Sequence, residues 1–87
     1  MEEVHFYIEL FQLYFDRELN GDEMEKICEL VSRRRTRMTV VRRYLAITCD
    51  IIHMLIKDAE TKKEILKGLA RKFPDERENI PFEFYLG

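Results

Sequence analysis

Polar side chains in the first part of the chain recur at the spacing of an α-helix. His5, Glu9, Gln12 and Asp16 fall at i, i+4, i+7 and i+11, whereas a strand would place polar side chains at every second position. The pattern predicts a helix over residues 3–18 that is apolar on nearly all of its remaining surface. Such a helix needs to be surrounded by protein.

The segment LNGD at residues 19–22 predicts the end of this helix and the start of the next. We expect a left-handed stop at Gly21 or Asn20 and an N-cap at Asp22. A second helix is then predicted over residues 23–34. Its inward positions are Met24, Ile27, Cys28 and Val31.

A third apolar stripe begins at Met38. If the second helix ran straight into the third, three arginines would lie on this stripe, so a break over Arg33–Thr36 is the simpler interpretation. Thr36 is then the expected N-cap of a third helix that runs to about Lys57. Its inward positions are Met38, Val41, Leu45, Thr48, Ile52 and Leu55.

A fourth helix is predicted from around Asp58–Thr61 to Pro74, which stops it. Thr61 and Glu64 have the spacing of a capping box at its start. The segment after it alternates apolar and polar side chains, which is strand periodicity in a tail too short to form a sheet. We therefore predict an all-α, small four-helix bundle-like domain over residues 1–74, followed by an extended C-terminal arm over residues 75–87.

Charge is unusually dense and unevenly distributed. Charged residues make up 37% of the chain, against a usual fraction of about 25%. Residues 1–32 contain nine acidic and two basic side chains, while residues 33–43 carry six arginines and no acid. High charge with only one Gln, two Asn and one Ser is typical of a thermophilic protein. The acidic N-terminus and the lack of a long apolar run predict a cytoplasmic protein without membrane association.

The arginine cluster is the leading candidate site. It consists of Arg33, Arg34, Arg35, Arg37, Arg42 and Arg43. Guanidinium groups bind phosphates in a bidentate manner, so the cluster predicts contact with a nucleic-acid backbone. The competing interpretation is a surface ion-pair network with Glu23, Glu25 and Glu29 of the second helix. The sequence leaves these two interpretations open.

The first helix carries the second candidate surface. A four-helix domain of this size can hardly cover such an aromatic helix on three sides, so we expect a homodimer or a subunit of a larger complex. The extended arm would pack on its own chain or on a second copy. The predicted interface residues are Phe6, Tyr7, Phe11, Tyr14, Phe15, Phe82 and Phe84.

Catalytic and metal chemistry have little support. Cys49 and His53 are four residues apart, and Cys28 is the one further thiol that could join them, whereas a closed structural zinc site normally needs four ligands. Ser32 has no histidine at a suggestive spacing, and the chain has no glycine-rich phosphate loop. We expect no cofactor, no metal and no small-molecule substrate.

These observations favour a non-enzymatic helical binding protein that contacts nucleic-acid phosphates through the arginine cluster with little sequence specificity. The alternative is a protein–protein interaction subunit, regulator or inhibitor that docks through the aromatic first helix and the same arginines. An enzyme acting on a small anion is a third, minority interpretation, because the cluster contains no identifiable acid or base.

Overall fold

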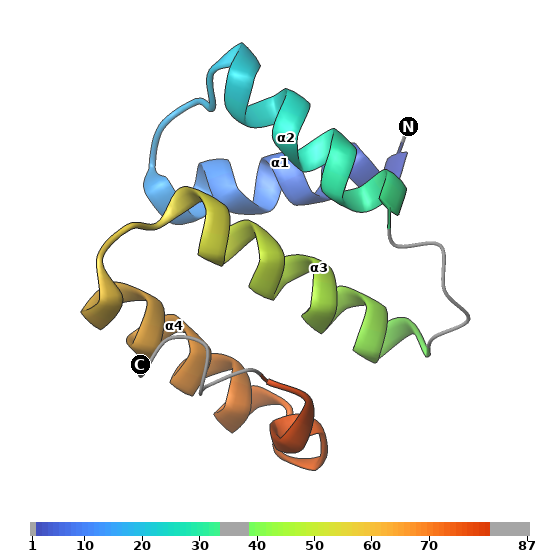
Figure 1. Ribbon diagram of the computed structural model, residues 1–87, viewed down its shortest axis with the longest axis vertical. Helices are drawn as coiled ribbons and strands as arrows, with labels where there is room; N and C mark the ends of the chain where they lie inside the picture. The colour runs from blue at the N-terminus through green and yellow to red at the C-terminus, as the bar shows by residue number, and fades with distance from the viewer. Residues whose placement is uncertain (1, 34–38, 81–87) are drawn as a thin grey trace. The chain divides into compact units, whose positions relative to one another are not determined.

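The computed structural model describes residues 2–33 and 39–80, and the secondary structure of these residues is entirely helical (Figure 1). The all-α class and the four predicted helices are confirmed in this part of the chain. The elements are α1 (Glu2–Phe15), α2 (Gly21–Arg33), α3 (Val40–Leu55), α4 (Ala59–Lys72) and a 3-10 helix, η1 (Pro74–Asn79).

The chain divides into two compact units, Met1–Thr36 and Arg37–Gly87. The first contains α1 and α2, and the second contains α3, α4 and η1. A single helical domain over residues 1–74 remains a prediction.

Helix α1 ends three residues before the predicted position. Asp16 adopts a left-handed conformation with φ 54°, and no glycine in the described residues has a positive φ. The Arg17 N–H donates to the Gln12 carbonyl at 3.2 Å and the Asp16 N–H donates to the Leu13 carbonyl at 3.3 Å. This pair of bonds is the Schellman pattern. The predicted stop at Gly21 or Asn20 is therefore wrong, because Asp also tolerates the left-handed region.

Helix α2 is capped by Asn20 and not by Asp22. The Asn20 side-chain oxygen accepts from the Glu23 N–H at 2.8 Å, and the Asn20 N–H donates to Glu23 Oε1 at 3.0 Å. These reciprocal bonds have the geometry of a capping box, with Asn20 as the N-cap and Glu23 as the N3 residue. The predicted N-cap at Asp22 is therefore wrong. Glu23 can form a capping box only with a cap three residues before it, and that residue is Asn20.

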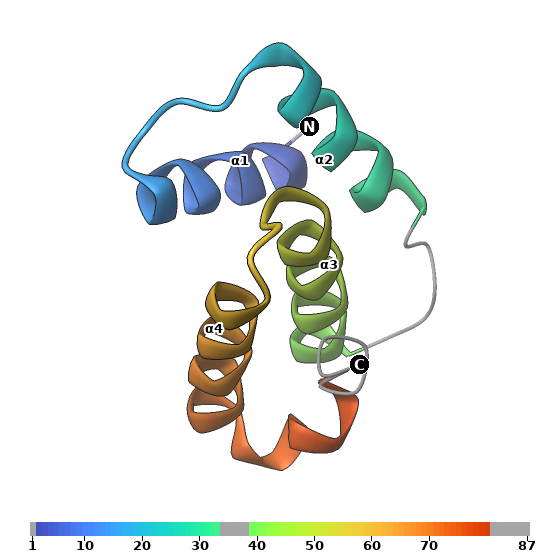
Figure 2. The ribbon, with the colours of Figure 1, turned by 60° about the vertical axis from the view of Figure 1, so that its left-hand side comes forward.

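In the first unit, α2 turns back and packs against α1 (Figures 1 and 2). The connecting loop is held by Gln12, whose Oε1 accepts from the Leu19 N–H at 3.1 Å. Arg17 forms an ion pair with Glu23 at 2.9 Å. The buried apolar side chains of this unit are Val4, Tyr7, Phe11, Leu19, Ile27 and Val31.

In the second unit, the N-cap of α3 lies three residues after the predicted position. Thr39 is the N-cap, and its hydroxyl accepts from the Arg42 N–H at 3.2 Å. The predicted N-cap at Thr36 is therefore wrong for α3. The residues between α2 and Thr39 lie outside the described part of the chain.

Helices α3 and α4 lie side by side and antiparallel (Figures 1 and 2). Asp58 caps α4, because its Oδ2 accepts from the Thr61 N–H at 2.9 Å and from the Thr61 hydroxyl at 2.6 Å. The predicted capping box at Thr61 and Glu64 is therefore wrong, since Thr61 already lies inside the helix. The buried side chains of this unit are Leu45, Ile47, Thr48, Cys49, Ile51, Ile52, Ile56, Leu66, Ala70 and Ile80.

The segment predicted as an extended arm begins as a helix. Pro74 occupies the first turn of η1, a position where the missing N–H of proline costs nothing. Helix η1 packs against both α3 and α4, and Ile80 directly after it is buried. The extended conformation is therefore wrong for residues 75–79, and residues 81–87 lie outside the described residues.

Candidate interaction surfaces

The first turn of α3 presents two arginines of the cluster. The Thr39 cap starts the helix, which places Arg42 and Arg43 three and four residues later. No acidic residue occupies this turn. Because the N-terminus of a helix carries a partial positive charge, arginines there add to the local positive potential. This turn therefore attracts anions more strongly than an arginine pair in the middle of a helix.

Arg42 contacts a carboxylate from η1. Its Nε lies 3.2 Å from Glu76 Oε2, and the Arg42 side chain remains 55% exposed. The same Glu76 oxygen accepts from Asn79 Nδ2 at 2.6 Å. The partner of Arg42 thus comes from the same unit, 34 residues along the chain, and from a segment for which the sequence predicted no such role.

Two valines beside Arg42 are exposed. Val40 is 85% exposed and Val41 is 38% exposed, so the prediction that Val41 faces the core is wrong. The buried face of α3 starts one turn later, at Leu45. We call this group, Val40, Val41, Arg42 and Arg43, the α3 basic patch. It combines apolar surface with guanidinium groups.

The other arginines are only partly described. Arg33 is the last residue of α2 and is exposed, where its charge complements the negative end of the helix dipole. Arg34, Arg35 and Arg37 lie outside the described residues. Arg33 and the α3 basic patch belong to different units.

Glu23 forms an ion pair with Arg17, which is not one of the cluster arginines. Its Oε1 accepts from Arg17 Nη1 at 3.0 Å and its Oε2 accepts from Arg17 Nη2 at 2.9 Å, a bidentate arrangement. The hydrogen bonds from Arg17, and then the bond from the Asn20 N–H, lower the pKa of Glu23 to about 2. One of the three glutamates expected to neutralise the arginine cluster is therefore committed to Arg17. Glu25 and Glu29 are exposed on α2.

The aromatic residues of α1 differ in how far they are buried. Tyr7 and Phe11 are 3% and 4% exposed, whereas Phe6 and Tyr14 are 51% and 53% exposed. Phe15 is half-buried, and the Arg17 guanidinium lies 5.2 Å from the centre of its ring. Phe82 and Phe84 lie outside the described residues.

Leu13 is an exposed residue of α1 that was not among the predicted interface residues. Its side chain is 81% exposed. The sequence spacing could have predicted this exposure, because Leu13 follows Phe6 by seven residues and therefore shares its helical face. By contrast, no sequence signal connects Glu76 to Arg42.

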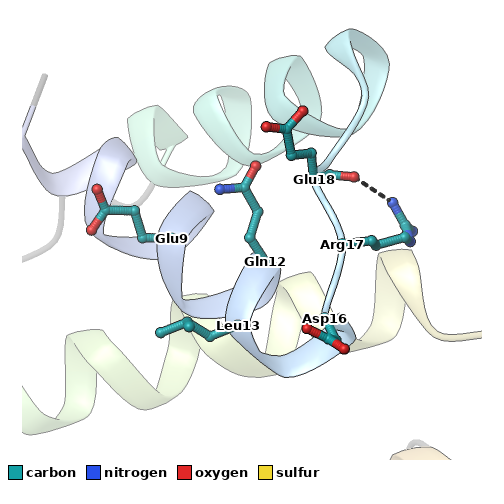
Figure 3. A pocket seen from close by; sticks show the side chains of 6 residues that line it. All are labelled: Glu9, Gln12, Leu13, Asp16, Arg17 and Glu18. Carbon is teal, nitrogen blue, oxygen red and sulfur yellow. Dashed lines mark hydrogen bonds between the residues drawn. The ribbon is translucent and has the colours of Figure 1, made fainter.

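A hollow of about 460 Å³ lies at the C-terminal end of α1 (Figure 3). Gln12 points toward the loop that follows α1, and Arg17 donates to the Glu18 carbonyl at 3.0 Å. None of the cluster arginines that the structure describes, Arg33, Arg42 and Arg43, lines this hollow, which has three carboxylates in its wall. The lining residues are Glu9, Gln12, Leu13, Asp16, Arg17 and Glu18.

The metal-ligating residue types do not gather in the described residues. Cys28 is half-buried on α2 and Cys49 is buried on α3. His53 is exposed, with its Nδ1 3.4 Å from Lys62 Nζ on α4. Within residues 2–33 and 39–80, no group of three His, Cys, Asp or Glu side chains is arranged to hold a metal ion.

Comparisons with known proteins provide no relative. No protein family, curated protein or solved structure shows significant similarity to this chain. Among the described helices, none is both long and apolar enough to cross a membrane. The α3 basic patch and the exposed side chains of α1 are therefore the features of the molecule that bear on its function.

Proposed function

We propose that this protein is a non-enzymatic binding protein that contacts nucleic-acid phosphates through its arginine cluster, with little sequence specificity. The observation that carries the proposal is the half-exposed Arg42 in a first helical turn without acidic residues. Six arginines in eleven residues extend this positive region along the chain. Arginine suits phosphate because its planar group donates two parallel hydrogen bonds.

The ion pair with Glu76 is compatible with phosphate binding. The contact uses Arg42 Nε, and a guanidinium has five N–H donors in total. An exposed pair of this kind contributes only about 0–1 kcal/mol, so a phosphate competes with it at little cost. The commitment of Glu23 to Arg17 also removes one neutralising group from the ion-pair interpretation.

The burial of one face of α3 supports nucleic-acid binding with little sequence specificity. A recognition helix inserts side chains into the major groove, but Leu45, Thr48 and Ile52 on α3 are all buried. Contacts to phosphates carry no sequence information directly. Binding to the phosphate backbone through the exposed Arg42, with the half-buried Arg43 beside it, is therefore the mode that this helix supports.

Fluorescence polarisation with labelled single- and double-stranded DNA and RNA tests the proposal. Four phosphate contacts predict a loss of affinity of roughly a hundredfold between 50 and 200 mM salt. The Arg34/Arg35/Arg42/Arg43→Ala variant should abolish most binding. The matched control is Lys57/Lys67/Arg71/Lys72→Ala, which removes the same charge from exposed positions elsewhere. No binding at low salt, or equal losses in both variants, would refute the proposal.

The alternative is an acidic protein partner, and the exposure of Val40 and Val41 specifically favours it. Apolar surface next to arginine is typical of protein interfaces, where arginine is enriched and most energy comes from a few buried side chains. A Val40/Val41→Ser variant distinguishes the two functions. It should retain salt-dependent nucleic-acid binding under the first proposal, and it should lose a copurifying, nucleic-acid-free partner under the second.

A further inference from the structure

Helix η1 is an acidic segment that is attached to the second unit at both of its ends. The ring of Phe73, the residue before it, lies 5.9 Å from the ring of Tyr44 on α3, measured between ring centres. Ile80, the residue after it, is 4% exposed. No residue within Pro74–Asn79 is buried. The apolar attachment of η1 therefore lies at its flanking residues, while its own polar side chains lie at the surface.

Helix η1 brings negative charge to the α3 basic patch. It contains three carboxylates and one arginine, whereas residues 40–43 contain two arginines and no acid. The chain turns back after α4, so that η1 contacts α3 as well as α4 (Figure 2). One of its carboxylates, that of Glu76, lies with Oε2 3.2 Å from Arg42 Nε. A segment of net negative charge thus lies beside the turn to which we assign phosphate binding.

The Glu76 carboxylate is held in place for this contact. Asn79 Nδ2 donates to the same oxygen, Oε2, at 2.6 Å, and only 20% of the Glu76 side chain is exposed. A side chain that is already ordered loses less conformational freedom when it forms a contact. Because Glu76 and Arg42 belong to the same unit, dilution of the protein does not separate them.

We propose that η1 is an autoinhibitory element, in which Glu76 lowers the affinity of Arg42 for nucleic-acid phosphates. This inference rests on the proposed function, because it concerns the regulation of the same arginine. Carboxylates and phosphates both accept charge-assisted hydrogen bonds from guanidinium groups. The other N–H donors of Arg42 can still reach a phosphate, but the carboxylate neutralises the positive charge and lies next to the incoming anion. The strongest binding therefore requires that Glu76 moves away from Arg42.

The inhibition is expected to be partial. The Arg42 side chain is 55% exposed, and an exposed ion pair changes an equilibrium constant by no more than about fivefold. When Glu76 leaves Arg42, its carboxylate keeps the hydrogen bond from Asn79. The core is unaffected, because η1 contains no buried residue. Salt screens the pair, so its inhibitory effect should decrease as the salt concentration rises.

Fluorescence polarisation with labelled single-stranded DNA and RNA at low salt, on the full chain, tests the proposal. Glu76→Gln keeps the size of the side chain and removes its charge, so it should tighten binding about two- to fivefold. Glu78→Gln is the matched control, because it removes the same charge from an exposed position of η1. It should tighten binding by less than about 1.5-fold, since only the long-range repulsion of the nucleic acid changes. Circular dichroism checks that both variants keep the fold.

An Arg42→Ala background shows whether Glu76 acts through Arg42. In that background, Glu76→Gln should tighten binding no more than Glu78→Gln does, because the contact that it relieves is already absent. The same comparison at higher salt should bring the two substitutions closer together in the wild-type background.

The outcomes separate this proposal from the proposed function. If neither the wild type nor Glu76→Gln binds any oligonucleotide at low salt, both are refuted. If the wild type binds but Glu76→Gln tightens binding no more than Glu78→Gln, autoinhibition is overturned, whereas binding by the cluster as a whole is decided separately by the variant that lacks four arginines. A tightening by Glu76→Gln that persists undiminished in the Arg42→Ala background also overturns autoinhibition, because Glu76 then acts elsewhere.

Discussion

The Arg17–Glu23–Asn20 network makes a sharp prediction about stability. Glu23→Gln keeps the size of the side chain but removes its charge, so the bidentate pair with Arg17 is lost. One amide oxygen remains to accept from the Asn20 N–H, which preserves the helix cap. The substitution therefore isolates the electrostatic part of the network.

The size of the effect follows from the geometry. Lowering the pKa of Glu23 from 4.5 to about 2 sets a ceiling of roughly 3 kcal/mol on its contribution to folding. The Glu23 side chain is 15% exposed but Arg17 is 51% exposed, and solvent screens such pairs strongly. We therefore expect a loss of about 1 kcal/mol, in the upper range for surface pairs because the contact is bidentate. That corresponds to a decrease in melting temperature of about 4–8 °C for a domain of this size.

The pH dependence has a defined sign. A carboxylate whose pKa is lower in the folded state stabilises that state above its unfolded pKa. The contribution of Glu23 is therefore complete above about pH 5 and is lost as the pH falls from its ordinary pKa of 4.5 toward about 2. The difference in unfolding free energy between wild type and Glu23→Gln should shrink over that interval.

Urea denaturation followed by circular dichroism, at pH values from 7 to 2.5, measures this difference. Glu25→Gln is the matched control, because Glu25 is exposed two residues further along the same helix, and it should change stability by less than about 0.3 kcal/mol. A double-mutant cycle that combines Glu23→Gln with Arg17→Gln should give a coupling free energy close to the whole loss of stability caused by Glu23→Gln. Equal effects of Glu23→Gln and Glu25→Gln at pH 7, or a Glu23→Gln deficit that persists undiminished at pH 2.5, would refute the reasoning.

Three further predictions concern the second unit. The buried Thr48 hydroxyl has no hydrogen-bond partner among the described residues, so Thr48→Val should raise the unfolding free energy by about 1 kcal/mol in urea denaturation. Leu66 is fully buried, so Leu66→Ala should cost about 2–5 kcal/mol by the same measurement and leave little folded second unit. Glu76→Gln removes the carboxylate beside Arg42 and should tighten nucleic-acid binding severalfold in polarisation assays, whereas unchanged or weaker binding would argue against Arg42 as a phosphate contact.

The existence of the four helices was predictable because helical periodicity is a local property. Polar side chains at His5, Glu9 and Gln12 are enough to exclude a strand. The helix ends were less predictable, since several residues in each loop have a side chain capable of capping. Asn20 caps α2 instead of Asp22 because Glu23 returns its hydrogen bond. Thr39 caps α3, whereas the sequence pattern predicted Thr36.

The sequence alone determined that four helices form, which positions are apolar and where positive charge is concentrated, because these properties depend only on neighbours within a few turns. Tertiary structure decided which apolar side chains are covered. Phe11 and Tyr14 are both aromatic residues of α1, yet one is 4% and the other 53% exposed, because burial depends on whether another element packs on that side. It also decided the partner of Arg42, since Glu76 approaches only after η1 folds back onto α3 and α4.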